Sequence, residues 1–391
     1  MSGKIARKIL VVTVGRSDFG ISREILNRIA EMDGLDYSLL VSGAHLSQAA
    51  GYTVREIEAE NRPIAARIPL PDSHGSEEAT AQAMATAVAG TATYLARERP
   101  DIVLVVGDRF ETFAIAAATV PFNLPLAHVH GGEVSFGATD DSFRHAITKI
   151  SHLHFAATRD YANRILQMGE EPWRVHVSGA PSLDNLRRAE LPDRAVLASR
   201  FNLNLDRPPL LVTFHPVTRQ SDDVGRQIQV LLDALRKVDI PIVITAPNAD
   251  VGSDVIRSEL ARFIAERPSV TLVESFGSLN YLAMLRESAA MIGNSSSGLI
   301  ETPAFALPTI NVGDRQDGRT RPQNVIDVAV DTDAIVAGLR RALSPEFREG
   351  LSGMANPYGD GTASDLIAKV LAAVEIDARL IAKRFHDMKT D

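Results

Sequence analysis

Short apolar runs rich in β-branched residues recur along this chain, and each is followed by a turn and a helical pattern. The run at residues 9–14 reads Ile-Leu-Val-Val-Thr-Val, which is typical of a strand buried on both faces. Further strands of the first half are predicted at residues 37–41, 101–106, 124–129, 153–157 and 175–177. Strands that alternate with helices pair in parallel through crossover connections, so this half is predicted to form a doubly wound parallel sheet.

The same alternation starts again after a stretch of different character. Residues 179–209 carry four prolines, mixed charge and no long apolar run, which indicates a connection between domains. A chain of 391 residues with 45% apolar residues can bury two cores. The predicted fold class is therefore α/β, with two Rossmann-like doubly wound domains and a cleft between them. Strands of the second half are predicted at residues 210–214, 241–245, 270–273, 290–292 and 309–312.

These patterns give the expected domain boundaries. Residues 1–180 are predicted to form the N-terminal domain, residues 181–209 the connection, and residues 210–362 the C-terminal domain. Residues 363–391 begin with a helical pattern and are expected to pack back on the N-terminal domain.

Composition excludes several classes of protein. The net charge is −8 and no block of Lys or Arg stands out, so nucleic acid is not an expected partner. Without cysteine, neither a disulfide framework nor a thiolate metal site can form. The first residues are basic but run straight into a strand, without the apolar region of a signal peptide. No apolar run approaches the roughly 20 residues that span a bilayer, so we expect a soluble cytoplasmic protein without a membrane partner.

The densest group of titratable side chains follows the strand at residues 124–129. A loop that leaves the carboxyl end of a parallel strand is where open α/β sheets place their chemistry. Proton transfer needs positioned acids and bases, and three glycines let the backbone bend between them. We therefore interpret the segment as an active site rather than a solvated polar loop. Its candidate residues are His128, His130, Glu133, Asp140, Asp141, Arg144 and His145.

Two other strands of the first half end in candidate residues. His45 follows the strand at residues 37–41, and Asp108 and Arg109 follow the strand at residues 101–106. Asp108 serves either the active site or the N-cap of the next helix, which is a common role for Asp.

The first strand ends in a tight turn, residues 15–20, that leads into a helix. The turn lacks the middle glycine of a dinucleotide fingerprint, and Ile21 stands where a P-loop has Lys. Arg16 and the N–H groups of the helix N-terminus make either an anion site or an ordinary turn with a surface arginine.

The loops of the second half suit a nucleoside diphosphate. Residues 293–298, Gly-Asn-Ser-Ser-Ser-Gly, place three hydroxyls before a helix predicted at residues 299–305. Such a loop suits a phosphate or diphosphate, although one serine as a helix cap is the simpler interpretation. Glu301 lies four residues after Ser297, where a carboxylate can accept both hydroxyls of a ribose. Arginines of residues 313–319 add guanidinium groups.

These motifs together resemble the UDP-N-acetylglucosamine 2-epimerases, in particular the hydrolysing branch of sialic-acid and related nonulosonic-acid synthesis. The resemblance covers nearly the whole chain and implies a glycosyltransferase-B-like fold. Its motifs are GDRFE at 107–111, HVHGGE at 128–133, DDSFRHAITK at 140–149, HPVT at 215–218, GNSSSG at 293–298 and GDRQDGR at 313–319.

The resemblance implies a reaction in two steps. The enzyme removes the proton at C2 of the sugar and expels UDP from C1, which leaves a glycal. Water then adds across the double bond and gives the free 2-epimer, N-acetylmannosamine. A base must take the C–H proton, and cations or dipoles must stabilise the departing diphosphate. No cofactor and no metal is implied, and the partner is a nucleotide-sugar substrate.

Carried onto this sequence, the family's carboxylates fall on Asp108 and Asp140. Where several relatives have Glu as a proposed acid/base, this chain has His130, so either His130 or Glu133 takes that role. Substrate contacts are expected from His45, Arg109, His128, Arg144 and His145. Nucleotide contacts are expected from Arg16, His215, Asn248, Ser295, Ser296, Ser297, Glu301 and Arg315.

Histidine at position 130 also resembles a sub-branch that acts on N,N′-diacetylbacillosamine carried on UDP or GDP, in legionaminic-acid synthesis. The same reaction on that sugar is therefore the first alternative. A non-hydrolysing epimerase, a glycosyltransferase and a non-enzymatic nucleotide-sugar sensor are further alternatives. A metal enzyme built on His128, His130 and Glu133 is disfavoured, because loop spacing need not bring them to one ion. A homo-oligomer, dimer or tetramer, is expected, although no sequence feature sets the number of subunits.

Overall fold

The computed structural model describes residues 6–71, 76–136, 139–188, 190–217, 223–247 and 252–388. Its contacts divide the chain into two compact units, which are described separately. Unit 1 comprises Met1–Glu133, Thr139–Asp184 and Tyr358–Asp391, and unit 2 comprises Val134–Ala138 and Asn185–Pro357. The C-terminal segment therefore belongs to the same unit as the N-terminus.

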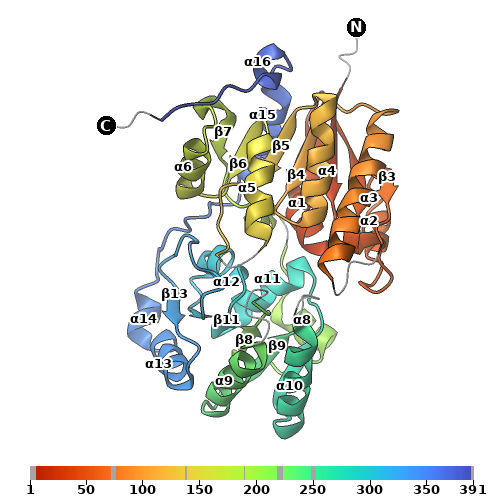
Figure 1. Ribbon diagram of the computed structural model, residues 1–391. Helices are drawn as coiled ribbons and strands as arrows, with labels where there is room; N and C mark the ends of the chain where they lie inside the picture. Colours follow the sequence, from red (N-terminus) through yellow and green to blue (C-terminus); the bar gives the residue numbers. More distant parts are fainter. Residues whose placement is uncertain are drawn as a thin grey trace. The chain divides into compact units, whose positions relative to one another are not determined.

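Unit 1 is built on a seven-stranded parallel sheet in the order β3-β2-β1-β4-β5-β6-β7 (Figure 1). Because β1 pairs with both β2 and β4, the order reverses direction beside β1, which is where open α/β sheets bind their ligands. The strands are β1 (Arg7–Thr13), β2 (Leu35–Ser42), β3 (Ile64–Ile68), β4 (Ile102–Val106), β5 (Leu126–Val129), β6 (Leu153–Ala156) and β7 (Val175–Val177).

Helices cover both faces of this sheet. Ile9 and Val11 of β1 pack with α1 and α15 on one face, and Leu10 and Val12 pack with α4 on the other. Burial on both faces explains why the strands read as continuous apolar runs. The helical segments of unit 1 are α1 (Arg16–Glu31), η1 (Gly43–Leu46), α2 (Val54–Ala59), α3 (Glu77–Leu95), α4 (Phe110–Thr119), η2 (Val120–Phe122), α5 (Asp140–Ile150), α6 (Arg159–Gln167), η3 (Pro172–Arg174), η4 (Pro181–Leu183), α15 (Ala363–Ala373) and α16 (Ala378–Ile381).

Unit 2 repeats the architecture with a six-stranded parallel sheet in the order β10-β9-β8-β11-β12-β13. Its strands are β8 (Leu210–Thr213), β9 (Ile242–Thr245), β10 (Val270–Val273), β11 (Ala290–Gly293), β12 (Thr309–Val312) and β13 (Val325–Val328). Its helical segments are α7 (Asp184–Arg188), which starts at the unit boundary, α8 (Arg194–Phe201), α9 (Val224–Arg236), α10 (Ser253–Glu266), α11 (Ser278–Glu287), α12 (Ser297–Ile300), η6 (Thr302–Phe305), α13 (Thr332–Ala342) and α14 (Pro345–Glu349).

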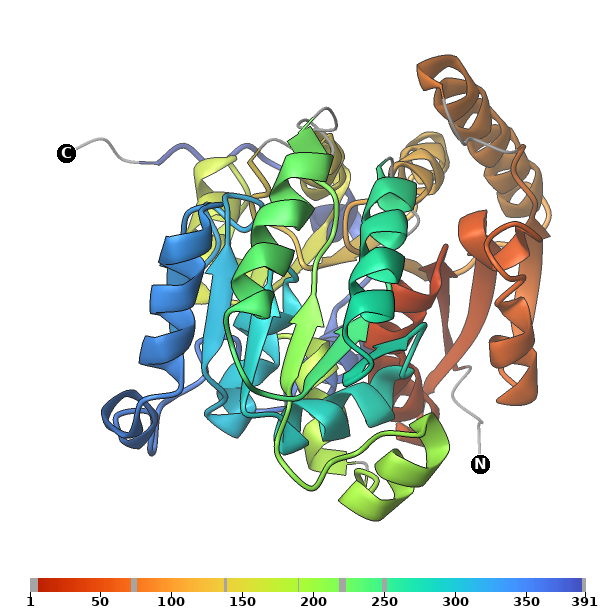
Figure 2. The same ribbon diagram turned by 90° about the horizontal axis from the view of Figure 1, so that it is seen from below.

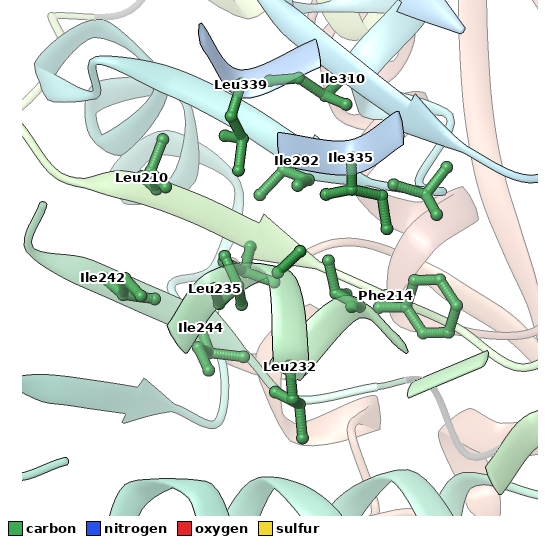
Figure 3. Close-up of a cluster of buried hydrophobic side chains, with 14 of the residues drawn as sticks. Leu210, Phe214, Leu232, Leu235, Ile242, Ile244, Ile292, Ile310, Ile335 and Leu339 are labelled. Carbon is green, nitrogen blue, oxygen red and sulfur yellow. The ribbon is translucent and has the colours of Figure 1, made fainter. Parts of the chain in front are cut away.

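The helices α9, α10 and α13 cover one face of this second sheet, as Figure 2 shows from below. Leu210 and Ile242 of the strands meet Leu235 of α9 and Leu339 of α13 in the core on that face (Figure 3). On the opposite face Leu211 packs against α8 and α11. Each unit therefore has the Rossmann-like, doubly wound architecture that the sequence predicts.

Four features differ from the prediction. The strands β3 and β13 were not predicted, and both lie at an edge of their sheet. The helical pattern at 363–383 is interrupted after Ala373, and a second short helix starts where the Asp377 carboxylate accepts a bond from the Leu380 N–H. The helix predicted at 299–305 is a single α-turn, α12, followed by the 3₁₀ turn η6.

Candidate functional site

The loop after β5 joins two of the predicted catalytic residues in a buried pair. His130 Nδ1 lies 2.6 Å from Glu133 Oε1, and the two residues are 8% and 3% exposed. The Nε2 atom of His130 is buried and has no hydrogen-bond partner among the described residues. When Glu133 accepts the Nδ1–H of the neutral ring, Nε2 carries the lone pair. The pair can therefore take a proton at Nε2 while Glu133 stabilises the resulting cation.

Local backbone geometry holds this loop in place. His130 has φ +66°, in the left-handed region that non-glycine residues rarely occupy and that often marks functional sites. Gly132 has φ +76°, and a Cβ there would lie 2.3 Å from the carbonyl oxygen of Tyr161. Arg164, also of α6, donates to the carbonyl of Gly132. Glycine at position 132 is thus needed for the close approach of the loop to α6.

Asp108, which follows β4, forms an ion pair with Arg144 of α5. Arg144 is 2% exposed and lies 3.3 Å from Asp141 as well. The N-cap of α4 is Arg109, so the carboxylate of Asp108 does not cap that helix, and its alternative role as a cap is not observed. Val106 of β4 pairs with Val129 of β5. Asp108 and His130 therefore follow neighbouring strands at the carboxyl end of the sheet.

Arg109 follows Asp108 in the chain and has a buried partner of its own. Its Nε and Nη2 atoms each lie 3.1 Å from a carboxylate oxygen of Glu111, which is 3% exposed. The charges of Asp18 and Asp140 also act on the Arg109 guanidinium, so Asp140, the first residue of α5, lies on the same side of unit 1. Glu111 was not among the predicted site residues, although it stands within the GDRFE motif.

His128 and His45 are fully buried, and each uses both ring nitrogens within unit 1. His128 Nε2 lies 2.8 Å from the Gly107 carbonyl, and Nδ1 lies 3.1 Å from the Thr148 hydroxyl. Burial lowers the pKa of His128 to about 3, so the ring is neutral at physiological pH. For these two predicted substrate-binding residues, the structure shows internal partners only.

His45, in η1, belongs to a chain of buried hydrogen bonds. Its Nδ1 lies 2.8 Å from the Thr53 hydroxyl and its Nε2 lies 2.9 Å from the Thr13 hydroxyl, which donates to Asp18 at 2.9 Å. Burial lowers the pKa of His45 to about 4 and raises the pKa of Asp18 to about 6. Asp18 also accepts from the Val14 N–H at 2.7 Å, which closes the turn before α1. Neither Asp18 nor the two threonines were predicted site residues.

Arg16 and His145 are more accessible. Arg16 is exposed at the first position of α1. The N-cap residue, Gly15, has no side chain that could cap the helix. His145 Nε2 lies 3.5 Å from Asp141 Oδ2. Both positions remain compatible with an anion or sugar contact.

In unit 2, Asn294 organises the residues at the ends of β8 and β11. Its side chain accepts from the His215 N–H and donates to the His215 carbonyl, both at 2.8 Å. The carbonyl of Asn294 accepts from Arg315 Nη1 at 3.0 Å and from Gln316 Nε2 at 2.8 Å. Burial lowers the pKa of His215 to about 3, with a smaller effect from Arg315. Asn294 itself was not among the predicted site residues, although it stands within the GNSSSG motif.

The serine loop of unit 2 approaches β8 closely. A Cβ on Gly293, which has φ +141°, would lie 1.9 Å from the Thr213 carbonyl oxygen. The N-cap of α12 is Ser296, whose side chain makes no cap hydrogen bond, while the Ser295 hydroxyl accepts weakly from the Ser297 N–H at 3.4 Å. Glu301 is the C-cap of α12, and its N–H bonds the Ser297 carbonyl at 3.1 Å. The loop thus brings Ser295, Ser296, Ser297 and Glu301 around one helical turn.

One predicted nucleotide contact falls outside the part of the chain that the structure describes. Asn248 lies outside the described residues, as does Thr218 of the HPVT motif. Within the described ranges, no three His, Asp or Glu side chains gather in a way that could hold a metal ion. No helix of the described chain is long and apolar enough to cross a membrane.

Known proteins place this chain in a family. The sequence pattern of the family described as UDP-N-acetylglucosamine 2-epimerase matches residues 27–372. A UDP-N,N′-diacetylbacillosamine 2-epimerase (hydrolyzing) of Legionella pneumophila is 36% identical and covers 96% of this chain and 98% of the relative. A GDP/UDP-N,N′-diacetylbacillosamine 2-epimerase (hydrolyzing) of Campylobacter jejuni is 34% identical over 88% and 89%.

The fold agrees with solved structures. The structure of UDP-GlcNAc 2-epimerase from Neisseria meningitidis bound to UDP-GlcNAc matches with a TM-score of 0.79 at 18% identity, over 93% of this chain and 99% of that one. The two parallel sheets and the family match define the class, an enzyme that acts on a nucleotide sugar. The chain belongs to the UDP-N-acetylglucosamine 2-epimerase family.

Proposed function

We propose that this protein is a hydrolysing 2-epimerase that converts a UDP-linked 2-acetamido sugar into the free 2-epimer and UDP. The observation that carries the proposal is the buried His130–Glu133 pair, whose Nε2 has no partner among the described residues. A histidine held in one tautomer by a carboxylate is suited to removing a weakly acidic C–H proton. Asp108 follows the neighbouring strand, and Asp140 begins α5.

In the first step the C2–H bond breaks, the proton passes to the base, and the C1–O bond breaks with its electron pair leaving on UDP. The electrons of the C–H bond form the C1=C2 double bond. In the second step water adds its oxygen to C1 while a proton is delivered to C2 on the opposite face. We assign the acid/base role at position 130 to His130 Nε2. Glu133 orients the imidazole ring and balances its positive charge when it is protonated. Asp108 and Asp140 are the carboxylates that complete proton transfer and water delivery.

The nucleotide contacts proposed for unit 2 are Ser295, Ser296, Ser297, Glu301, His215 and Arg315. The Asn294 side chain and carbonyl hold His215 and Arg315 beside the serine loop, so these groups are preorganised for an anion. Burial keeps His215 neutral, so Arg315 supplies the positive charge. Arg16 of unit 1 and Asn248 stay proposed contacts.

Of the two candidate sugars, we favour N,N′-diacetylbacillosamine over N-acetylglucosamine. Two relatives at 36% and 34% identity are named as hydrolysing epimerases of that sugar, whereas a Neisseria meningitidis relative named UDP-N-acetylglucosamine 2-epimerase is 30% identical. The favoured reaction would yield 2,4-diacetamido-2,4,6-trideoxymannose and UDP.

Proton NMR of the products formed in heavy water tests the reaction and the substrate together. Separate incubations would contain UDP-N-acetylglucosamine, UDP-N,N′-diacetylbacillosamine and the GDP form of the latter. We expect fastest turnover of UDP-N,N′-diacetylbacillosamine, with free UDP and a reducing sugar that carries deuterium at C2. A product still bound to UDP would indicate a non-hydrolysing epimerase, and a retained C2 proton would exclude the elimination mechanism.

A further inference from the structure

His128 lies in a closed ring of contacts that joins the loop after β4 to helix α5. Gly107 has φ +78° and directs the chain into Asp108. Its N–H donates to the Val129 carbonyl at 3.1 Å, and its carbonyl accepts from His128 Nε2 at 2.8 Å. The turn that places Asp108 is therefore held by β5 on both of its backbone polar groups.

The other side of the His128 ring faces α5. Because Nε2 donates its hydrogen to a carbonyl, Nδ1 of the neutral ring must accept, and the hydroxyl of Thr148 lies 3.1 Å away to donate. A Cβ on Gly131 would lie 2.9 Å from Nδ1 and 3.0 Å from the Thr148 oxygen, so glycine at 131 leaves room for this bond. The Gly107 carbonyl thereby fixes the tautomer of His128, and the Thr148 hydroxyl ties the ring to α5.

Helix α5 returns to Asp108 through a second contact. Arg144, one turn before Thr148, forms the buried ion pair with Asp108. The contacts thus run from Gly107 through His128 and Thr148 to α5, and from α5 through Arg144 back to Asp108. Every group in this closed circuit of contacts, except Asp108 itself, is buried or belongs to the backbone.

We propose that His128 is a positioning residue that fixes Asp108 relative to α5, and that Thr148 acts through it by donating to Nδ1 and holding the ring against α5. The inference rests on the proposed function, in which Asp108 takes part in proton transfer. It replaces the expectation that His128 contacts the substrate, since no nitrogen of the ring is left for one. Burial keeps the ring neutral, so the arrangement stays unchanged across the physiological pH range.

The variant Thr148→Val removes the hydroxyl and keeps the shape. We expect kcat to fall on the order of tenfold, because a small displacement of Asp108 slows the chemical step more than it weakens binding. The Kd for UDP should stay within about twofold of the wild type, a split between chemistry and binding that general destabilisation would not produce. Thr148→Ser restores the donor and should restore kcat.

The matched control is Thr91→Val in α3. Thr91 is 1% exposed and its hydroxyl has no hydrogen-bond partner among the described residues, so this variant removes a buried hydroxyl without breaking a bond. It should leave kcat and the UDP Kd unchanged. Comparison of the melting temperatures of both valine variants separates the effect of changed packing on stability from the effect of the lost hydrogen bond.

NMR gives a readout that does not depend on turnover. Nitrogen-15 spectra of the His128 ring should show the hydrogen on Nε2 in the wild type. In protein labelled with carbon-13 at the aspartate carboxyl, the Asp108 signal, assigned with Asp108→Asn, should move in Thr148→Val and return in Thr148→Ser. If no nucleotide sugar is turned over, the proposed function fails, while these spectra still decide the role of His128. A hydrogen on Nδ1, an unmoved Asp108 signal, or a folded Thr148→Val enzyme with wild-type kcat would overturn the inference.

Discussion

Nδ1 of His130 and Oε1 of Glu133 are 2.6 Å apart, and both side chains are buried at the carboxyl end of β5. The positive φ of His130 turns its ring toward a residue only three positions further along the chain. In the mechanism we propose, this contact gives different roles to two residues between which the sequence left the acid/base role open. In that mechanism His130 offers Nε2 to the substrate proton, and Glu133 fixes the tautomer and stabilises the charged ring.

Glu133→Gln keeps a hydrogen-bond acceptor for Nδ1 but removes the negative charge. We expect kcat to fall at least on the order of 10²-fold, because the imidazolium formed on proton abstraction loses its stabilising carboxylate. His130→Asn should show a comparable loss in the same assay of UDP release. If His130→Asn is only mildly impaired while Glu133→Gln is inactive, the acid/base role belongs to Glu133.

Asp108→Asn and Asp140→Asn test the two carboxylates. Each amide keeps the shape and hydrogen-bonding capacity of the acid but cannot accept a proton as a base, so kcat should fall at least on the order of 10²-fold with UDP binding nearly intact. Circular dichroism of Asp108→Asn is the control, because this variant also changes the partner of the buried Arg144. Near wild-type turnover by both variants would show that neither carboxylate takes part in the reaction.

The interior strands were predictable because burial on both faces leaves a continuous apolar run in the sequence. Of the four edge strands, β7 and β10 were predicted, whereas β3 and β13 were not. In β3 the exposed Arg67 breaks the apolar pattern, and in β13 the exposed Asp327 does the same, because an edge strand is covered on fewer sides. An exposed charged residue within a short edge strand therefore limited what the apolar pattern could predict.

The candidate site was predictable as a set of loops, whereas the partners of its side chains were not. Thr148 is 20 residues from His128, and Thr13 is 32 residues from His45, so only the folded chain brings each pair together. Local contacts carried a usable signal: Glu111 stands two residues after Arg109 and could have been inferred as its partner. The roles of buried histidines depend on such distant hydroxyls, and a motif such as DDSFRHAITK, which contains Thr148, does not say which histidine its hydroxyl contacts.

The double variant Ser296→Ala with Glu301→Ala tests the nucleotide contacts in unit 2. Ser296 makes no cap hydrogen bond to α12, so its hydroxyl is available to a ligand, and Glu301 is expected to accept the ribose hydroxyls. Calorimetry should show UDP binding weakened on the order of tenfold or more, as expected when hydrogen bonds to charged groups are lost. The exposed pair Ser352→Ala with Glu346→Ala is the matched control. Unchanged UDP affinity in the first variant would contradict the assignment.

Asp18 gives a prediction for the pH dependence of stability. Burial raises its pKa from an ordinary value of 3.8 to about 6, so between these pH values the native state binds more protons than the unfolded chain. The contribution of this group to the free energy of unfolding therefore falls as pH rises from about 4 to about 6. Asp18→Asn removes the titration and keeps an oxygen that can accept from Thr13 and Val14. Relative to wild type, this variant should gain up to roughly 3 kcal/mol of stability between pH 4 and pH 7. Urea unfolding of both proteins at the two pH values measures the difference, and an identical difference at both would show that the Asp18 carboxyl is already ionised at pH 4.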